Sequence, residues 1–161
     1  MVKKSAPIDI VVRISIDAPL QTSFDHIVPV DLSHIFHRFL LVPGVKRTDE
    51  SQKWITPGLS RTVYFDDGST AREALLTVAP PESFSYKISE GTGINRLLVT
   101  HIMGEWQFTG SDNETNIIWT YSLHARNAVT RAVTNVFVAP MLRVFLQRAL
   151  DILKRDLEKE K

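Results

Sequence analysis

The longest regular pattern of apolar positions in the chain covers Asn127–Lys159. Apolar side chains recur there at helical spacing and no glycine interrupts them, so the pattern predicts one long helix. Over Arg143–Lys161 this helix is amphipathic, with charged residues opposite the apolar stripe. The segment Val136–Ala139 is instead apolar on every side. Pro140 follows it directly and predicts a kink or a break, because proline removes a backbone donor and clashes one turn back.

The residues before this helix alternate between apolar and polar side chains, which is typical of half-buried β-strands. A first strand is expected at Ile8–Ile16, and a run of further strands is expected over Leu59–Ala125. A long helix that follows a run of strands needs a sheet to pack on, so the sequence predicts an α+β fold. The length of 161 residues predicts a single domain over residues 1–161.

Two short helices are expected between the first strand and the remaining strands. Leu20–Ile27 carries a helical apolar stripe, and a second helix is predicted to begin after the N-cap residue Asp31 with a stripe that reaches Phe39. The following segment, Leu40–Pro57, has no regular pattern and is predicted to be a long loop. Trp54 within it either plugs the edge of the core or lines the mouth of a pocket.

The strongest turn signal is the Asp67-Gly68 pair between two alternating segments. Two registers are possible for this hairpin. A two-residue turn would put Arg61 and Glu73 on opposite faces of the sheet. A three-residue loop, with Gly68 left-handed in a bulge, would set Arg61 directly across from Glu73. The second register is favoured because it pairs opposite charges.

Later strands place mostly aromatic and aliphatic side chains on the predicted inner face. One strand is expected over Leu98–Thr109, and Gly104 within it suggests a bend or a bulge. His101 and His124 fall on the predicted outer face, which argues against a catalytic role for either.

Composition excludes several classes of function. The net charge of +1, from 19 basic and 18 acidic residues, gives no electrostatic basis for binding nucleic acid or an anionic membrane. The chain has no cysteine, which excludes disulfides and thiolate chemistry. No apolar run approaches the roughly 20 residues that span a membrane. Residues 1–4 are not followed by a long apolar run, so no signal peptide is expected and a cytoplasmic location is predicted.

Motifs for metals, phosphates and hydrolysis are also missing from the sequence. There is no glycine-rich phosphate loop, no paired-histidine zinc helix and no serine nucleophile elbow. His34 and His37 share one helix face, but no third ligand lies near them in the sequence, so no metal site is expected. No cofactor is expected.

Four patches of the sequence occur in a characteristic order: residues 57–63, the Asp67-Gly68 turn with Glu73 after it, Pro80-Pro81 before Phe84, and residues 104–106 followed by 115–121. Together with the order of the predicted elements, they resemble the START-like (SRPBCC) superfamily, in particular its single-domain bacterial members. This superfamily includes the birch pollen allergen and the bacterial polyketide cyclase/dehydrase and lipid-transport proteins. The resemblance covers nearly the whole chain.

The resemblance implies a helix-grip fold, in which a strongly curved antiparallel sheet wraps around the long C-terminal helix. It also implies a cavity between sheet and helix for a hydrophobic or amphipathic small molecule. Some members carry lipids or hormones and others cyclise polyketides, so the fold does not settle the function.

Arg61, Glu73 and Tyr86 are the polar candidates for this cavity. Three roles are open for them. In the first, Arg61 and Glu73 form a structural ion pair that holds the hairpin, and Tyr86 is hydrogen-bonded to this pair. In the second, the three residues anchor the polar part of a ligand. Alternatively, Glu73 is a general acid or base, and Tyr86 or Arg61 polarises a carbonyl group.

We expect the protein to bind a lipid- or polyketide-like molecule between the sheet and the C-terminal helix. The expected ligand-binding residues are Arg61, Glu73, Phe84, Tyr86, Trp106, Trp119, Tyr121, Phe137 and Met141. A carrier is favoured over an enzyme because no histidine is predicted beside Glu73. One alternative is a polyketide cyclase or dehydratase that uses Glu73 as acid or base. Another is an interaction module that uses the apolar surface around Val138, which is also a candidate homodimer interface.

Overall fold

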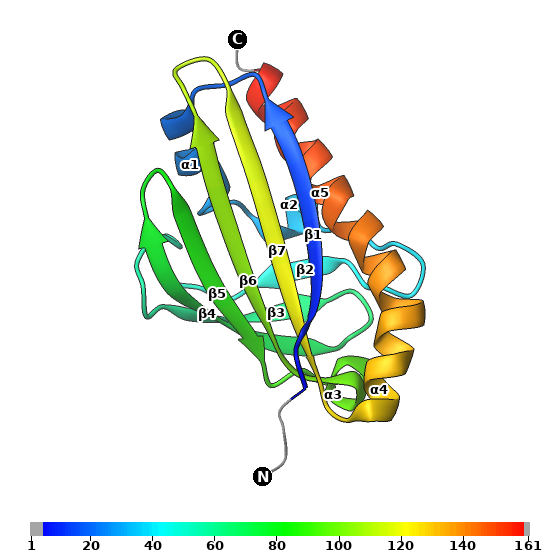
Figure 1. Cartoon of the computed structure of the whole chain (residues 1–161). Helices are drawn as coiled ribbons and strands as arrows, with labels where there is room; N and C mark the ends of the chain where they lie inside the picture. Colours follow the sequence, from blue (N-terminus) through cyan, green and yellow to red (C-terminus); the bar gives the residue numbers. More distant parts are fainter. Residues whose placement is uncertain (1–4, 160–161) are drawn as a thin grey trace.

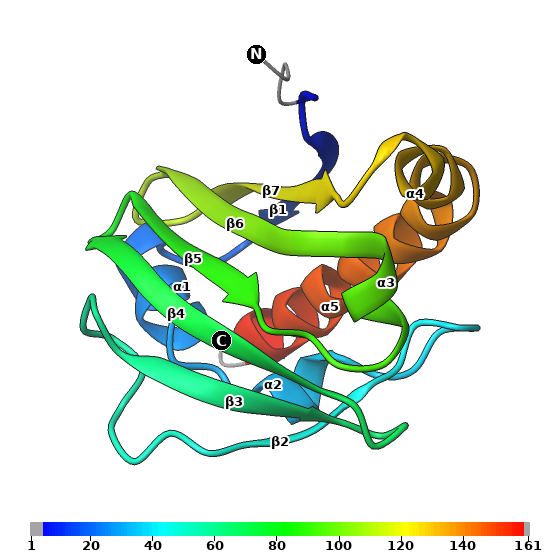
Figure 2. The same cartoon turned by 90° about the horizontal axis from the view of Figure 1, so that it is seen from below.

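In the computed structural model, one seven-stranded antiparallel sheet curves around a long C-terminal helix (Figures 1 and 2). The sheet order is β1-β7-β6-β5-β4-β3-β2. The strands are β1 (Ile8–Ile16), β2 (Val45–Thr48), β3 (Ser60–Phe65), β4 (Thr70–Ala79), β5 (Ser83–Ser89), β6 (Val99–Gly110) and β7 (Thr115–Ala125). The predicted α+β helix-grip fold is therefore confirmed.

The structure describes residues 5–159. Residues 1–4, on which the expectation about a signal peptide partly rests, and residues 160–161 at the end of the predicted amphipathic helix lie outside the described residues. No helix of the described part is both long and apolar enough to cross a membrane.

Helices occupy the concave side and one end of the sheet (Figure 2). They are α1 (Leu20–Ile27), α2 (Leu32–Ile35), α3 (Ile94–Leu98), α4 (Ala128–Val133), the π-helical turn η1 (Thr134–Val138) and α5 (Ala139–Lys159). The two short helices after β1 are confirmed, and the Asp31 carboxylate caps α2 by accepting from the Ser33 N–H at 2.9 Å. The second helix is shorter than predicted, because it ends at Ile35 and leaves Phe39 outside it.

The β3–β4 hairpin adopts the three-residue register. Arg61 pairs with Glu73, and the Phe65 N–H donates to the Ser69 carbonyl at 2.9 Å. Gly68 has φ +86°, a left-handed conformation that glycine adopts without strain. The register that the charge pairing favoured is thus confirmed.

The C-terminal helix does not break at Pro140. Helical structure is continuous over residues 128–159, and the turn just before the proline widens into a π-helix, in which the Ala139 N–H donates to the Thr134 carbonyl five residues back. A wider turn suits this position, because proline has no N–H to give and its ring crowds the carbonyl four residues earlier. Of the two expected alternatives, a kink or a break at Pro140, the break does not occur.

The long helix covers the open edge of β1. Three of its polar side chains, Arg143, Gln147 and Lys154, donate to the carbonyls of Val11, Arg13 and Ser15. These bonds satisfy an edge that would otherwise present unpaired carbonyls. On its other face, α5 buries an apolar stripe against the sheet, so the helix is held between the edge and the concave face.

Two segments differ from their predicted structure. The expected loop Leu40–Pro57 contains the short strand β2, which pairs with β3; its pattern was weak because Lys46 and Arg47 are polar. Strand β6 begins at Val99, one residue later than expected, because the preceding residues form α3.

Candidate functional site

Two adjoining chambers lie between the concave face of the sheet and the C-terminal helix. The inner chamber has a volume of about 70 Å³. The outer chamber has a volume of about 260 Å³. Phe65, Ile88, Tyr121 and Phe145 line both chambers, so the two meet at these side chains.

The inner chamber has an aromatic wall that comes from neighbouring strands. Trp106 on β6 lies directly across from Trp119 on β7, and their rings stack with centroids 4.2 Å apart. Phe84 on β5 continues the stack at 5.4 Å from Trp106. Strand alternation produces this wall, because residues two apart on a strand point to the same face.

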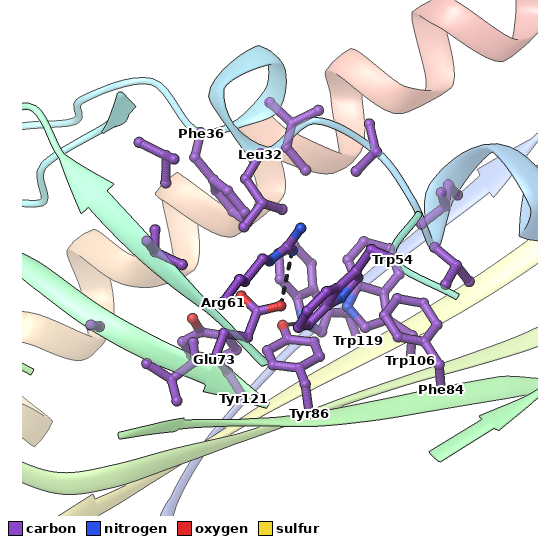
Figure 3. A pocket seen from close by; sticks show the side chains of 18 of the residues that line it. Leu32, Phe36, Trp54, Arg61, Glu73, Phe84, Tyr86, Trp106, Trp119 and Tyr121 are labelled. Atoms are coloured by element: carbon purple, nitrogen blue, oxygen red, sulfur yellow. Dashed lines mark hydrogen bonds and ion pairs between the residues drawn. The ribbon is translucent and has the colours of Figure 1, made fainter. Parts of the chain in front are cut away.

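Most of the predicted ligand-binding residues line this inner chamber. Figure 3 shows their side chains around one space: Arg61, Glu73, Phe84, Tyr86, Trp106, Trp119 and Tyr121. All of them are buried. Their role in binding stays a prediction.

Gly104 makes room for Tyr86. A Cβ at Gly104 would lie 2.2 Å from the Tyr86 Cζ, so only a glycine lets the ring cross this strand. Of the bend or bulge predicted at Gly104, the bulge is absent: β6 pairs with β7 in regular register there, and the register shift lies between Val99 and His101. The glycine serves a close approach, which is the other common reason for a glycine within a strand.

The Tyr86 hydroxyl accepts a hydrogen bond from Trp119 Nε1 at 3.0 Å. The sequence interpretation that bonded it to the ion pair is therefore replaced by this partner. Burial, together with the nearby Glu73 carboxylate, raises the Tyr86 pKa, so the phenol keeps its proton at neutral pH.

Arg61 is the buried centre of a charge cluster that also contains the buried Glu73 and the partly exposed Glu50. Its side chain is 2% exposed and donates from Nη2 to Glu73 Oε1 at 3.0 Å and from Nη1 to Glu50 Oε1 at 2.8 Å. The guanidinium also lies 4.0 Å from the centroid of the Trp54 ring. Trp54 is itself buried and also lines the inner chamber. The two roles expected for it, filling the edge of the core and lining a pocket, are therefore combined.

The two carboxylates of the cluster differ in pKa. Burial raises the pKa of Glu73 above its ordinary value, against the attraction of Arg61. Burial also pushes the pKa of Glu50 upward, but hydrogen bonds, including one with Thr48, and the Arg61 charge outweigh it and lower that pKa. Glu50 is therefore the ionised partner of Arg61 at neutral pH, and Glu73 is the carboxyl group that takes up a proton more readily.

Two buried polar atoms next to the chambers have no hydrogen-bond partner within the described residues. They are Arg61 Nε at the inner chamber and Thr134 Oγ1 at the outer chamber. Thr134 lies in η1 and is fully buried. Unpaired buried polar atoms are uncommon, and a bound ligand is one explanation for them.

Phe137 and Met141 line the outer chamber rather than the aromatic wall. Phe137 is 66% exposed, so it stands at the mouth. The sequence prediction grouped both residues with Trp106 and Trp119 in one pocket, whereas here they line the chamber that adjoins the aromatic one; their role in binding stays a prediction.

Sequence reasoning missed Glu50 and Thr134. Glu50 was noticed only as part of a charged loop, and Thr134 was one polar residue in a helix pattern. The local sequence does not link either residue to the site. The path of the loop brings Glu50 to Arg61, and the π-helical turn brings Thr134 to the outer chamber.

The histidines considered as metal ligands have other partners. His34 Nε2 lies 2.7 Å from Asp156 Oδ2, and His37 Nε2 lies 2.8 Å from the His34 carbonyl. Over residues 5–159, no group of three or more histidine, aspartate and glutamate side chains is arranged to hold a metal ion.

Comparison with known families gives a match over nearly the whole chain. The model of the family described as polyketide cyclase / dehydrase and lipid transport matches residues 7–158. No curated protein is similar enough in sequence to count as a relative.

Solved structures with this fold share little sequence with the chain. Ginseng major latex-like protein 151 from Panax ginseng superposes with a TM-score of 0.66 at 12% identity, over 95% of this chain and 99% of that one. Protein MLL2253 from Mesorhizobium loti gives 0.64 at 14% identity, over 96% and 99%. DynU16, a protein in the dynemicin biosynthetic locus, gives 0.61 at 20% identity over 95% of this chain. The chain spans 48% of DynU16. At such identities the likeness shows the fold alone.

Proposed function

Because the chain belongs to the polyketide cyclase/dehydrase and lipid-transport family, we propose that it binds a hydrophobic or amphipathic small molecule in its two chambers. The ligand is of a lipid- or polyketide-like kind. The observation that carries this proposal is a buried aromatic chamber that contains an unpaired donor, Arg61 Nε, and adjoins a larger apolar chamber. An apolar pocket with few polar groups is the usual form of a small-molecule site.

The arrangement gives the ligand an orientation. Its polar end lies in the inner chamber near Arg61, Glu73 and Tyr86. Its apolar body fills the outer chamber, whose lining is largely apolar and whose mouth carries Phe137. Burial of the apolar body supplies most of the affinity, at roughly 25 cal/mol per Å² removed from water.

Native mass spectrometry of the protein as purified tests this function. The proposal expects an adduct that survives gentle ionisation, disappears on denaturation and partitions into organic solvent. The Ile88→Phe variant, which fills the junction of the two chambers, should lose the adduct. The matched control Val129→Phe adds the same ring at a position that is 73% exposed and should retain it.

A cyclase or dehydratase is the second candidate function. The observation that favours it is Glu73, a buried carboxyl group of raised pKa that faces the same space as Tyr86 (Figure 3). In this mechanism Glu73 transfers a proton to or from the substrate, and the Tyr86 hydroxyl donates to a substrate carbonyl.

We favour the carrier for a structural reason. No histidine lines either chamber among the described residues, and the second carboxylate, Glu50, bonds the other side of the Arg61 guanidinium rather than Glu73. Glu73→Gln separates the candidates. In an enzyme it abolishes turnover and keeps ligand affinity, whereas in a carrier it alters affinity or stability and there is no turnover to lose.

A further inference from the structure

We propose that the inner chamber selects an uncharged oxygen acceptor, such as a ketone, ester or amide carbonyl, and rejects a carboxylate. The proposal rests on the function proposed above and narrows the chemical class of the ligand's polar end. It follows from three features of the Arg61 cluster: how its charge is balanced, which donor it leaves free, and what stands beside that donor.

The positive charge of Arg61 is already balanced by carboxylates of the protein. Arg61 and Glu73 are the charged side chains that line the inner chamber in the described part of the chain, and Arg61 bonds both Glu73 and Glu50. One guanidinium thus faces two carboxylates. A third carboxylate, brought in by a ligand, would meet no surplus positive charge in a site where water is excluded.

The two pKa shifts are consistent with this balance. The lowered pKa of Glu50 keeps it ionised as the counter-ion of Arg61, whereas burial raises the pKa of Glu73 against the attraction of Arg61. With Glu73 protonated the cluster is neutral, and with Glu73 ionised it is negative, so in neither state does it have surplus positive charge. An anion in this chamber could form only single hydrogen bonds with the cluster, and these do not compensate for the loss of the anion's hydration.

The cluster leaves one nitrogen of the Arg61 guanidinium without any hydrogen-bond partner within the described residues. A guanidinium carries five N–H groups, and the two carboxylates use the Nη1 and Nη2 atoms. Arg61 Nε is buried and has no hydrogen-bond partner within the described residues. An ion pair with a purely structural role would not need to leave this donor unpaired, whereas a ligand oxygen that accepts from it would satisfy it.

Tyr86 supplies a second donor in the same chamber. Its oxygen accepts from Trp119 Nε1, so its own O–H remains to be given to another group. Figure 3 shows the Tyr86 and Arg61 side chains on two sides of one space. A carbonyl oxygen, with two lone pairs and no charge, matches two donors in a site whose one positive charge is already paired.

Three ligands that share one aromatic body test the selectivity: 2-acetylnaphthalene, 2-naphthoate and 2-ethylnaphthalene. Isothermal titration calorimetry of the whole protein at pH 7.5 gives their dissociation constants. The ketone should bind at least tenfold more tightly than the carboxylate and several-fold more tightly than the hydrocarbon. A carboxylate that binds as tightly as the ketone overturns this inference and leaves the proposed function standing. If none of the three binds, both are overturned.

A variant outside the chamber tests the charge balance itself. Glu50→Gln removes one negative charge from Arg61 without touching the lining, so 2-naphthoate should bind at least fivefold more tightly and the ketone within twofold of its former affinity. Glu105→Gln is the matched control, because Glu105 is exposed on the outer face of β6 and the protein's net charge changes equally. An unchanged affinity of Glu50→Gln for 2-naphthoate overturns the argument from charge.

Tyr86→Phe provides a check that does not depend on the charge cluster. It should weaken the ketone about fivefold, towards the affinity of the hydrocarbon, and leave 2-naphthoate unaffected. Loss of all three ligands equally would mean that the ring, not the hydroxyl, matters, and would overturn the role of this donor.

Discussion

Arg61 lies directly across the β3–β4 hairpin from Glu73, and its Nη2 donates to the Glu73 Oε1 at 3.0 Å in a site closed to solvent. This pair joins the hairpin to the inner chamber. The same guanidinium holds Glu50 of the preceding loop, so the cluster also fixes a segment with little regular structure of its own.

The first prediction concerns the energetic coupling of this pair. Arg61→Met leaves Glu73 buried without its cation and should lower the free energy of unfolding by about 3–5 kcal/mol. The double variant Arg61→Met/Glu73→Gln should be more stable than Arg61→Met alone, because it removes the stranded carboxyl group. Urea melts of both single variants and the double variant measure this; additive losses would show that the two side chains do not interact.

The second prediction concerns pH. In the folded protein, burial raises the pKa of Glu73 above the ordinary 4.5 that the unfolded chain has. Between these two values the folded state holds more protons than the unfolded state, so the stabilising contribution of Glu73 falls as pH rises through this window and is constant above it. Glu73→Gln should remove that slope.

Urea melts at a series of pH values from 4 to 9 would measure the difference between the two proteins. The lowered pKa of Glu50 acts in the opposite sense, because its contribution is lost as pH falls below the ordinary value of 4.5. The two effects thus fall on different sides of that pH. Parallel pH profiles for the wild type and Glu73→Gln would contradict the raised pKa.

The third prediction concerns the space that Gly104 leaves for the Tyr86 ring. Gly104→Ala puts a methyl group into the Tyr86 ring, so the ring must move and its bond with Trp119 must break. The variant should lose about 1–3 kcal/mol of stability, as overpacked cores do, and its tryptophan emission should shift. Gly91→Ala is the control, since its nearest neighbour would be 3.3 Å away. Equal stability of the two variants would show that the ring does not depend on Gly104.

The fourth prediction separates structure from binding at Thr134. Its hydroxyl is buried without a partner, so Thr134→Val should leave stability unchanged or raise it by up to about 1 kcal/mol. If the hydroxyl holds a ligand, affinity should fall several-fold in the same variant. Thr120→Val on β7 controls for the exchange of a hydroxyl for a methyl group. A large loss of stability in Thr134→Val would mean that the hydroxyl has a structural partner.

Local patterns were enough to predict the hairpin and the strands of the sheet other than β2. Alternation places Trp119 and Tyr121 on one face, and opposite charges at Arg61 and Glu73 selected the register that the structure has. Both depend on neighbours along the chain or across one turn. The order of the elements then led to the helix-grip fold.

Other parts of the site depend on tertiary packing. Glu50 reaches Arg61 because the loop before β3 folds back over the hairpin, and a sequence pattern does not record such a path. The widened turn before Pro140 buries Thr134, where an ordinary helix wheel or a broken helix was expected. The single pocket predicted from the inner face divided into two chambers because side chains such as Ile88 and Tyr121 stand between them.

The central claim is that the two chambers bind a hydrophobic small molecule, and tryptophan fluorescence tests it most directly. All three tryptophans of the chain, Trp54, Trp106 and Trp119, line the inner chamber, so their emission has no background from elsewhere. Titration with the uncharged probe N-phenyl-1-naphthylamine should quench this emission saturably at one probe per chain. Ile88→Phe should abolish the quenching, and Val129→Phe should preserve it. Quenching that does not saturate, or that is the same in Ile88→Phe, would contradict the account.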